Sequence, residues 1–150
     1  MLESCCAIET VSEDEWTAIL NCERSFKEVS KERLRKSIIH GIPPYLRGEI
    51  WCLLCNIEEE ASYHSVDLYQ KLLDINNPVE EYKISKDIKR TLPELKMFQE
   101  DYQTGKNKLF NVLKAYATYD NDIGYAQGVN YLAAILLIQI EDEVKAFWCL

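Results

Sequence analysis

Apolar residues recur along this chain at spacings of three and four positions, and this spacing predicts helices along most of its length. Glycine and proline, which would punctuate tightly turning strands, are scarce, with 5 and 4 occurrences among 150 residues. We therefore expect an all-α fold, an irregular arrangement of about eight helices.

Helix boundaries are marked by capping residues. Ser12 and Glu15 have the spacing of a capping box, in which each side chain bonds the backbone N–H of the other. Further helices are expected after Ser30, at Pro43-Pro44, at 66–73, 84–88, 109–117 and 129–139, and from 141 onward. The acidic run 58–60 is expected at a solvated helix end or loop, and a loop is expected around Gly105. Segment 129–139 is apolar on nearly all sides and predicts a central, buried helix.

Composition narrows the classes of partner. The formal net charge of -8 disfavours nucleic acids and anionic membranes as primary partners, because both select basic surfaces. The longest apolar run, 131–138, is far shorter than the roughly 20 residues of a membrane span, so we expect no direct membrane insertion. The chain opens without the pattern of a signal peptide. We therefore expect a cytoplasmic protein with reduced thiols.

The sequence gives little support to a catalytic or metal-binding role for its cysteines and histidines. Cys52 and Cys55 form a CxxC pair, but zinc requires four ligands and no second pair is present. The pair lies inside a predicted helix beside Trp51, so we interpret both thiols as packing residues. His40 and His64 have no serine or cysteine partner at a telling spacing. We predict no metal site.

Segment 84–93 places two charged side chains on one helix face. Asp87 and Arg90 are three positions apart, so the carboxylate can hold the guanidinium. Pro93 is expected to close the helix directly after Arg90, which puts Arg90 on the last turn with its side chain projecting outward. An ordinary surface ion pair explains the same pattern.

Segment 124–130 places a glutamine between two glycines, just before a predicted helix. Gly124 and Gly128 allow positive φ or close backbone approach. The amide of Gln127 both donates and accepts, as the orientation of a water molecule requires. A helix N-terminal turn with a capping glutamine or asparagine is the alternative. No phosphate-binding GxxxxGK[ST] motif is present, so the chain is not expected to hydrolyse nucleotides itself.

Taken together, these segments resemble the TBC family of Rab GTPase-activating proteins, from about Lys36 to Leu150. Three motifs occur in the order of the family, and Ala146-Phe147-Trp148 follows them. They are Arg47-x-x-x-Trp51 within 41–51, Ile84-x-x-Asp87-x-x-Arg90 within 84–93, and Tyr125-x-Gln127 within 124–130.

The resemblance implies a TBC-type fold in 36–150, preceded by a helical extension in 1–35, and a domain that continues beyond Leu150. It also implies a mechanism with two catalytic fingers. Arg90 would be the arginine finger and Gln127 the glutamine finger, both supplied in trans to a Rab-family small GTPase. The substrate would be Mg-GTP bound by that partner, with no cofactor of the chain's own.

The resemblance assigns supporting roles as well. Asp87 would orient Arg90, and Trp51 and Arg47 would act as a packing residue and a charge near the site. Three residues would shape the glutamine loop or touch the partner: Tyr125, Gly128 and Asn130. The expected setting is vesicle trafficking, with peripheral recruitment to endomembranes.

Two other functions are compatible with the sequence. A non-catalytic helical adaptor would bind a Rab or another protein through the same groove without accelerating hydrolysis. A thiol or zinc protein built on Cys52 and Cys55 would carry a redox-active pair or bound metal.

Overall fold

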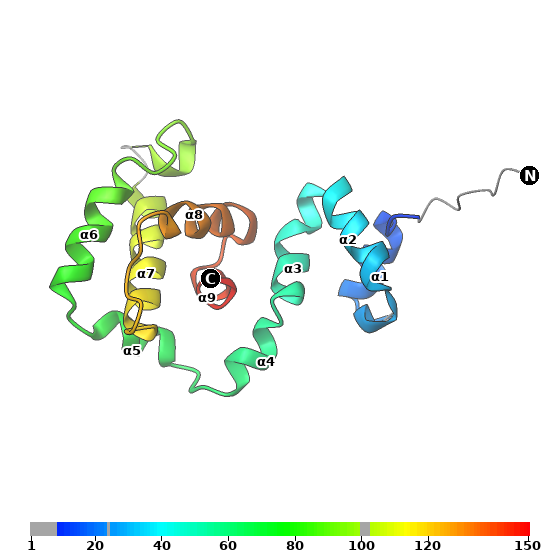
Figure 1. Cartoon of the computed structure of the whole chain (residues 1–150), viewed down its shortest axis with the longest axis horizontal. Coiled ribbons are helices and arrows are strands. Elements are labelled where there is room, and N and C mark those ends of the chain that lie inside the picture. Colours follow the sequence, from blue (N-terminus) through cyan, green and yellow to red (C-terminus); the bar gives the residue numbers. More distant parts are fainter. Residues whose placement is uncertain (1–8, 24, 100–102) are drawn as a thin grey trace, which may run out of the picture. The chain divides into compact units, whose positions relative to one another are not determined.

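The computed structural model describes residues 9–23, 25–99 and 103–150 (Figure 1). Within these ranges the chain is helical and contains no strand, which confirms the all-α prediction. The described residues form nine α-helices and two short 3-10 helices. These are α1 (Glu13–Leu20), η1 (Phe26–Glu28), α2 (Lys31–His40), α3 (Pro44–Leu54), α4 (Ile57–Ser62), α5 (Leu68–Asp74), α6 (Pro78–Ile88), η2 (Lys96–Phe98), α7 (Gln103–Tyr119), α8 (Val129–Ile140) and α9 (Glu143–Cys149).

The chain divides into two compact units, and the division falls inside helix α3. The first unit extends to Ile50, and the second comprises Trp51–Leu150. The candidate site described below lies entirely in the second unit.

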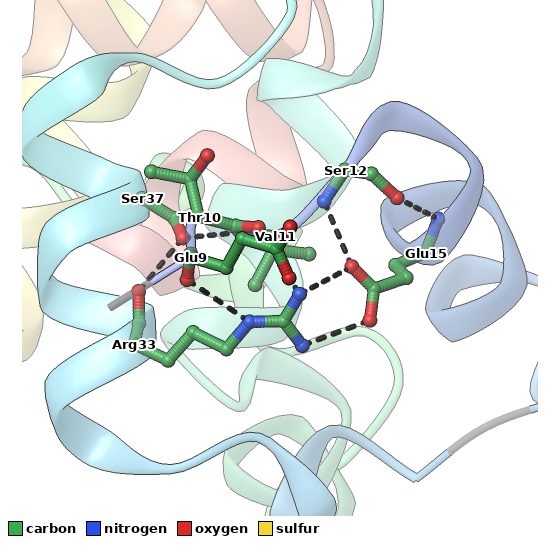
Figure 2. Close-up of polar contacts among 7 residues, drawn as sticks. All are labelled: Glu9, Thr10, Val11, Ser12, Glu15, Arg33 and Ser37. Carbon is green, nitrogen blue, oxygen red and sulfur yellow. Dashed lines mark hydrogen bonds and ion pairs between the residues drawn. The ribbon is translucent and has the colours of Figure 1, made fainter. Parts of the chain in front are cut away.

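In the first unit, the guanidinium of Arg33 on α2 joins several backbone and side-chain groups of the preceding segment (Figure 2). Its Nη1 and Nη2 donate to the two carboxylate oxygens of Glu15 at 2.8 and 2.6 Å. Nε and Nη2 also donate to the carbonyl oxygens of Glu9 and Thr10, both at 3.1 Å. Glu15 at the same time completes the predicted capping box with Ser12. The planar guanidinium fork suits this arrangement of acceptors.

A buried serine adds a second link between the same segments. The backbone N–H of Val11 donates to Oγ of Ser37 at 2.7 Å, and that hydroxyl donates to the carbonyl of Arg33. Ser37 is 2% exposed, so its hydroxyl satisfies backbone groups that are shielded from water. Trp16 and Ile19, on the inner face of α1, are buried as well.

In the second unit, α7 is the central helix and packs against α5, α6, α8 and α9 (Figure 1). Its inner face carries Leu109, Val112 and Leu113, all fully buried at the three- and four-residue spacing of a helix. Small residues on α7, α8 and α9 allow the helices to approach closely: Ala115, Ala117, Ala133, Ala134 and Ala146.

The loop predicted around Gly105 is wrong, because this glycine lies in the first part of α7 and is buried. A Cβ atom at Gly105 would lie 2.0 Å from the carbonyl oxygen of Met97 in η2. The glycine is therefore required by the close contact between α7 and η2. A packing requirement of this kind leaves no mark in the local sequence that distinguishes it from a loop signal.

The acidic run 58–60 lies in the first turn of α4, so it does mark a helix end. Negative side chains in this position interact favourably with the positive end of the helix dipole. Asn56, the residue before α4, has a left-handed backbone with φ of 53°. This conformation separates α4 from α3.

The prediction that segment 129–139 is buried on nearly all sides is wrong for one face. Helix α8 packs through Ala133, Ala134 and Leu137, whereas Leu132 and Ile135 are 59% and 43% exposed. Apolar composition shows that a helix can be covered, but coverage depends on which neighbours are present.

Among the described residues, none of the helices combines the length and the apolar character that a membrane span requires.

Candidate functional site

The first segment of the candidate site is the end of α6. Asn77 caps the start of this helix and Pro78 opens it, while Ile84 and Ile88 anchor it in the core. Arg90 was expected on the last turn, but the helix ends at Ile88 and Arg90 lies just beyond it. At this point the backbone no longer makes the four-residue bonds of an α-helix. The carbonyl of Asp87 accepts the N–H of Arg90, only three residues ahead, at 3.1 Å.

The carboxylate of Asp87 links the two motifs. Its Oδ1 accepts from Nε and Nη2 of Arg90 at 3.1 and 2.7 Å, and its Oδ2 accepts from the hydroxyl of Tyr125 at 2.6 Å. The side chain of Asp87 is 9% exposed, whereas that of Arg90 is 59% exposed. The buried carboxylate of Asp87 thus fixes Nε and Nη2 of the exposed guanidinium of Arg90.

Tyr125 remains a hydrogen-bond donor over a wide pH range. Burial raises the pKa of its hydroxyl above the ordinary value for tyrosine, and the bond to Asp87 raises that pKa further. The buried ring therefore stays neutral and keeps its proton directed at the carboxylate. This contact joins the loop between α7 and α8 to α6, and the role of Tyr125 in shaping that loop stays a prediction.

The second segment of the site is the loop between α7 and α8. Gly124 and Gly128 have positive φ values of 65° and 105°, which confirms that this loop uses the backbone freedom of glycine. Between them, Tyr125 is buried and Gln127 is exposed. Gly128 is the N-cap residue of α8, and its N–H donates to Oδ1 of Asn130 at 3.1 Å.

A buried polar link joins the two segments a second time. Nδ2 of Asn130 donates to Oγ1 of Thr91 at 2.8 Å, and Oγ1 of Thr91 donates to the carbonyl of Asp87 at 2.7 Å. Thr91 and Asn130 are each 1% exposed. Thr91 was not identified as a site residue from the sequence, although it directly follows Arg90 in the second motif.

The side chains of both motifs meet at a surface pocket of about 420 Å³. Its lining consists of Arg90, Gln127, Gly128, Asn130 and Tyr131. Four of these five residues were identified from the sequence, and Tyr131 was not. A larger pocket of about 630 Å³ lies along α6 and α7 and includes two lysines, Lys89 and Lys106, but neither of the expected finger residues.

The two remaining predicted site residues belong to helix α3. Arg47 lies in the first unit, where its Nη2 donates to the carbonyl of Ile42 at 3.0 Å. Trp51 is half-buried at the start of the second unit. Their supporting roles at the site stay predictions.

Cys52 and His64 take part in packing. The interpretation of both thiols as packing residues is wrong for Cys55, which lies just beyond the end of α3 and is exposed, and His40 is exposed as well. Cys52 is buried, and its burial raises the pKa of its thiol, which makes it a weaker nucleophile. His64 stacks on Trp148 with ring centroids 5.2 Å apart and contacts the hydroxyl of Tyr119 at 3.2 Å. Within the part of the chain that the structure describes, no group of three or more potential ligands is arranged to hold a metal ion.

Comparisons with known proteins identify the family to which the chain belongs. The family model of the Rab-GTPase-TBC domain matches residues 44–150. The chain is 36% identical over 136 residues to the ecotropic viral integration site 5 protein homolog of Homo sapiens. The alignment covers 89% of this chain and 16% of the human protein. It is 36% identical over 132 residues to the GTPase-activating protein GYP5 of Saccharomyces cerevisiae. That alignment covers 88% of this chain and 14% of the yeast protein.

A solved structure has the same fold. The crystal structure of the TBC domain of a Chlamydomonas flagellar RabGAP superposes with a TM-score of 0.77 at 21% sequence identity, over 89% of this chain and 46% of that chain. The chain therefore spans about half of this solved domain and a smaller share of the two curated relatives. The family model and both relatives agree, and the chain belongs to the Rab-GTPase-TBC domain family.

Proposed function

We propose that this chain is the part of a Rab GTPase-activating protein that supplies two catalytic side chains, Arg90 and Gln127, to the active site of a GTP-bound partner. The observation that carries the proposal is the pocket that both side chains line. Arg90 and Gln127 come from separate helix ends, and buried bonds through Asp87 and Asn130 hold those ends together.

Arg90 acts as the arginine finger. Its guanidinium neutralises the negative charge that develops between the β- and γ-phosphates of the GTP. An arginine finger is worth about 10³–10⁵ in rate, or roughly 4–7 kcal/mol of the barrier. Asp87 engages Nε and Nη2 of the guanidinium and so sets its direction. Nη1 is then the nitrogen best placed to reach a phosphate oxygen, because it lies on the outer side of the fork.

Gln127 acts as the glutamine finger and takes over the water-orienting task of the GTPase's own glutamine. Its amide accepts a hydrogen bond from the attacking water and donates one to it or to a phosphate oxygen. Its position between the anchored Tyr125 and the cap of α8 limits the freedom of the loop. Catalysis by positioning needs this rigidity.

The other residues support these two. Asp87 positions Arg90, and the remaining members of the loop, Tyr125, Gly128 and Asn130, shape it or contact the partner. Arg47 and Trp51 support the docking surface. The substrate is Mg-GTP held by the Rab, and the chain needs no cofactor of its own. We expect the protein to be recruited peripherally from the cytoplasm to the endomembranes on which Rab proteins act.

The proposal is tested by single-turnover GTP hydrolysis with a panel of Rab proteins and the full-length protein. We expect one or more Rabs to be stimulated, and we expect Arg90→Ala to reduce that stimulation by about 10³-fold. Lys89→Ala is the matched control, because it removes the adjacent exposed cation without touching the pocket of Arg90 and Gln127. A Rab that binds in its GTP form with an unchanged hydrolysis rate would instead indicate the non-catalytic adaptor.

A further inference from the structure

Glu80 lies in the first turn of α6, at the opposite end of this helix from Asp87. Its Oε2 accepts the backbone N–H of Tyr125 at 2.9 Å, and its Oε1 accepts from Nζ of Lys83 at 2.7 Å. The side chain of Glu80 is 16% exposed, whereas that of Lys83 is 50% exposed. The carboxylate thus faces the glutamine loop, and Lys83 covers its outer side.

The backbone of the loop lies against this carboxylate. Gly124 has a φ of 65°, and a Cβ atom added to it would lie 3.4 Å from the carboxyl carbon of Glu80. The bond from Lys83 and the bond from the Tyr125 N–H together lower the pKa of Glu80 below the ordinary glutamate value. The acceptor is therefore charged at neutral pH, and hydrogen bonds to a charged acceptor are stronger than neutral ones.

Two carboxylates of one helix thus hold a single residue of the loop. Glu80 holds the main chain of Tyr125, and Asp87 holds its phenolic hydroxyl. Gln127 is two residues further along. With both the main chain and the side chain of Tyr125 fixed to α6, the loop is left little freedom to move Gln127 away from Arg90.

We propose that Glu80 is a positioning residue for catalysis, which holds the backbone of the glutamine loop so that Gln127 meets the attacking water. The proposal rests on the function proposed above. It assigns Glu80 no contact with substrate, so removal of its side chain acts on kcat through Gln127 and leaves binding of the Rab nearly unchanged.

The test compares three substitutions of Glu80 in stimulated GTP hydrolysis by a responsive Rab, with the full-length protein. Glu80→Ala is expected to lower kcat about tenfold with little change in KM, the effect of losing one hydrogen bond to a charged group. Glu80→Gln keeps the length and an accepting oxygen but loses the charge that strengthens the bond, so its activity is expected to lie between those of Glu80→Ala and the wild type. Glu80→Asp keeps the charge but is one carbon too short to reach the N–H of Tyr125, so it is expected to fall below Glu80→Gln.

This order separates positioning from a structural role of the charge. A negative charge that merely stabilises the start of α6 would make Glu80→Asp the better variant, because aspartate is favourable in a first helical turn. Glu81→Ala is the matched control, since the neighbouring Glu81 bonds Lys114 and the N–H of Asn77 instead of the loop. An activity of Glu80→Asp equal to or above that of Glu80→Gln would overturn the proposal, even if Glu80→Ala does not fold.

A double-mutant cycle provides the second readout. Glu80→Ala is expected to cost nothing further when Gln127→Ala is already present, and to keep its full effect on the background of Arg90→Ala. A full additional loss on the Gln127→Ala background would contradict a role through the glutamine. If Arg90→Ala and Gln127→Ala themselves leave stimulation intact, the proposed function fails. If they strongly reduce it while Glu80→Ala matches Glu81→Ala, only the role of Glu80 fails.

Discussion

The hydroxyl of Tyr125 donates a 2.6 Å hydrogen bond to Oδ2 of Asp87, the same carboxylate whose Oδ1 holds Arg90. This bond joins the arginine segment to the glutamine segment through one buried anion. It also gives a reason for the presence of Asp87 in the motif of Arg90 and of Tyr125 in the motif of Gln127. Neither residue contacts the substrate in the proposed mechanism. The pair Asp87 and Tyr125 keeps Arg90 and Gln127 at one pocket.

Removal of this hydroxyl is expected to impair catalysis. Tyr125→Phe keeps the buried ring but leaves the carboxylate of Asp87 with only its bonds to Arg90. A hydrogen bond to a charged group is worth about 1.5–3 kcal/mol, so we expect kcat of stimulated hydrolysis to fall by roughly tenfold or more. Tyr116→Phe is the control, because it removes a phenolic hydroxyl from α7, outside segments 84–93 and 124–130. Equal rates for Tyr125→Phe and the wild type would show that the bond does not matter for catalysis.

Gly105→Ala is expected to destabilise the protein although alanine is the better helix former. The added methyl group would lie 2.0 Å from the carbonyl oxygen of Met97, so η2 or α7 has to shift. Overpacking of this kind costs about 1–3 kcal/mol, measured by urea unfolding. The adjacent exposed residue supplies the control, since Thr104→Ala should leave stability unchanged or raise it slightly. A stabilising effect of Gly105→Ala would contradict the close contact between α7 and η2.

Ser37→Ala is expected to weaken the first unit. It leaves the backbone N–H of Val11 buried without its acceptor, a loss of about 1–3 kcal/mol. Thr17→Ala removes an exposed hydroxyl that bonds only its own helix, and its effect is expected to stay within about 0.5 kcal/mol. The comparison is made by thermal unfolding of both variants. Similar melting temperatures for the two would mean that the bond between Ser37 and Val11 contributes little.

The stability that Glu81 contributes is expected to depend on pH. The ion pair with Lys114 lowers the pKa of Glu81 in the folded protein, so its contribution is complete above the ordinary glutamate pKa. That contribution is lost as the pH falls through the lower pKa of the folded state. Glu81→Gln should therefore be less stable than the wild type at neutral pH, and the difference should close in acid. A difference that stays constant or widens in acid, measured by urea unfolding from pH 7 to pH 3, would contradict the ion pair.

Most helix positions could be predicted because capping and periodicity are local properties. Ser12 and Ser30 mark helix starts through bonds to residues three positions further along the chain, and the structure shows those bonds. Gly105 was misread because the same residue type that ends helices also permits close packing between them. The exposed face of α8 was misread because the coverage of Leu132 depends on other elements, which its own sequence does not describe.

The candidate site was predictable in its residues but not in its connections. Arg90 and Gln127 were identified through motif resemblance, and the structure brings them to one pocket. The bond between Thr91 and Asn130 could not be read from the sequence, because it joins residues far apart in the chain. Glu80 was missed for the same reason, since its partner is a backbone N–H that every non-proline residue carries.

The central claim is that Gln127 performs the work of the GTPase's own glutamine while Arg90 stabilises the transition state. It is tested most directly with a responsive Rab whose water-orienting glutamine has been replaced by leucine, in single-turnover hydrolysis with the full-length protein. We predict that the wild-type protein still stimulates this Rab strongly, and that Gln127→Ala abolishes the stimulation. Loss of stimulation when only the Rab glutamine is replaced, or full stimulation by Gln127→Ala, would contradict the account.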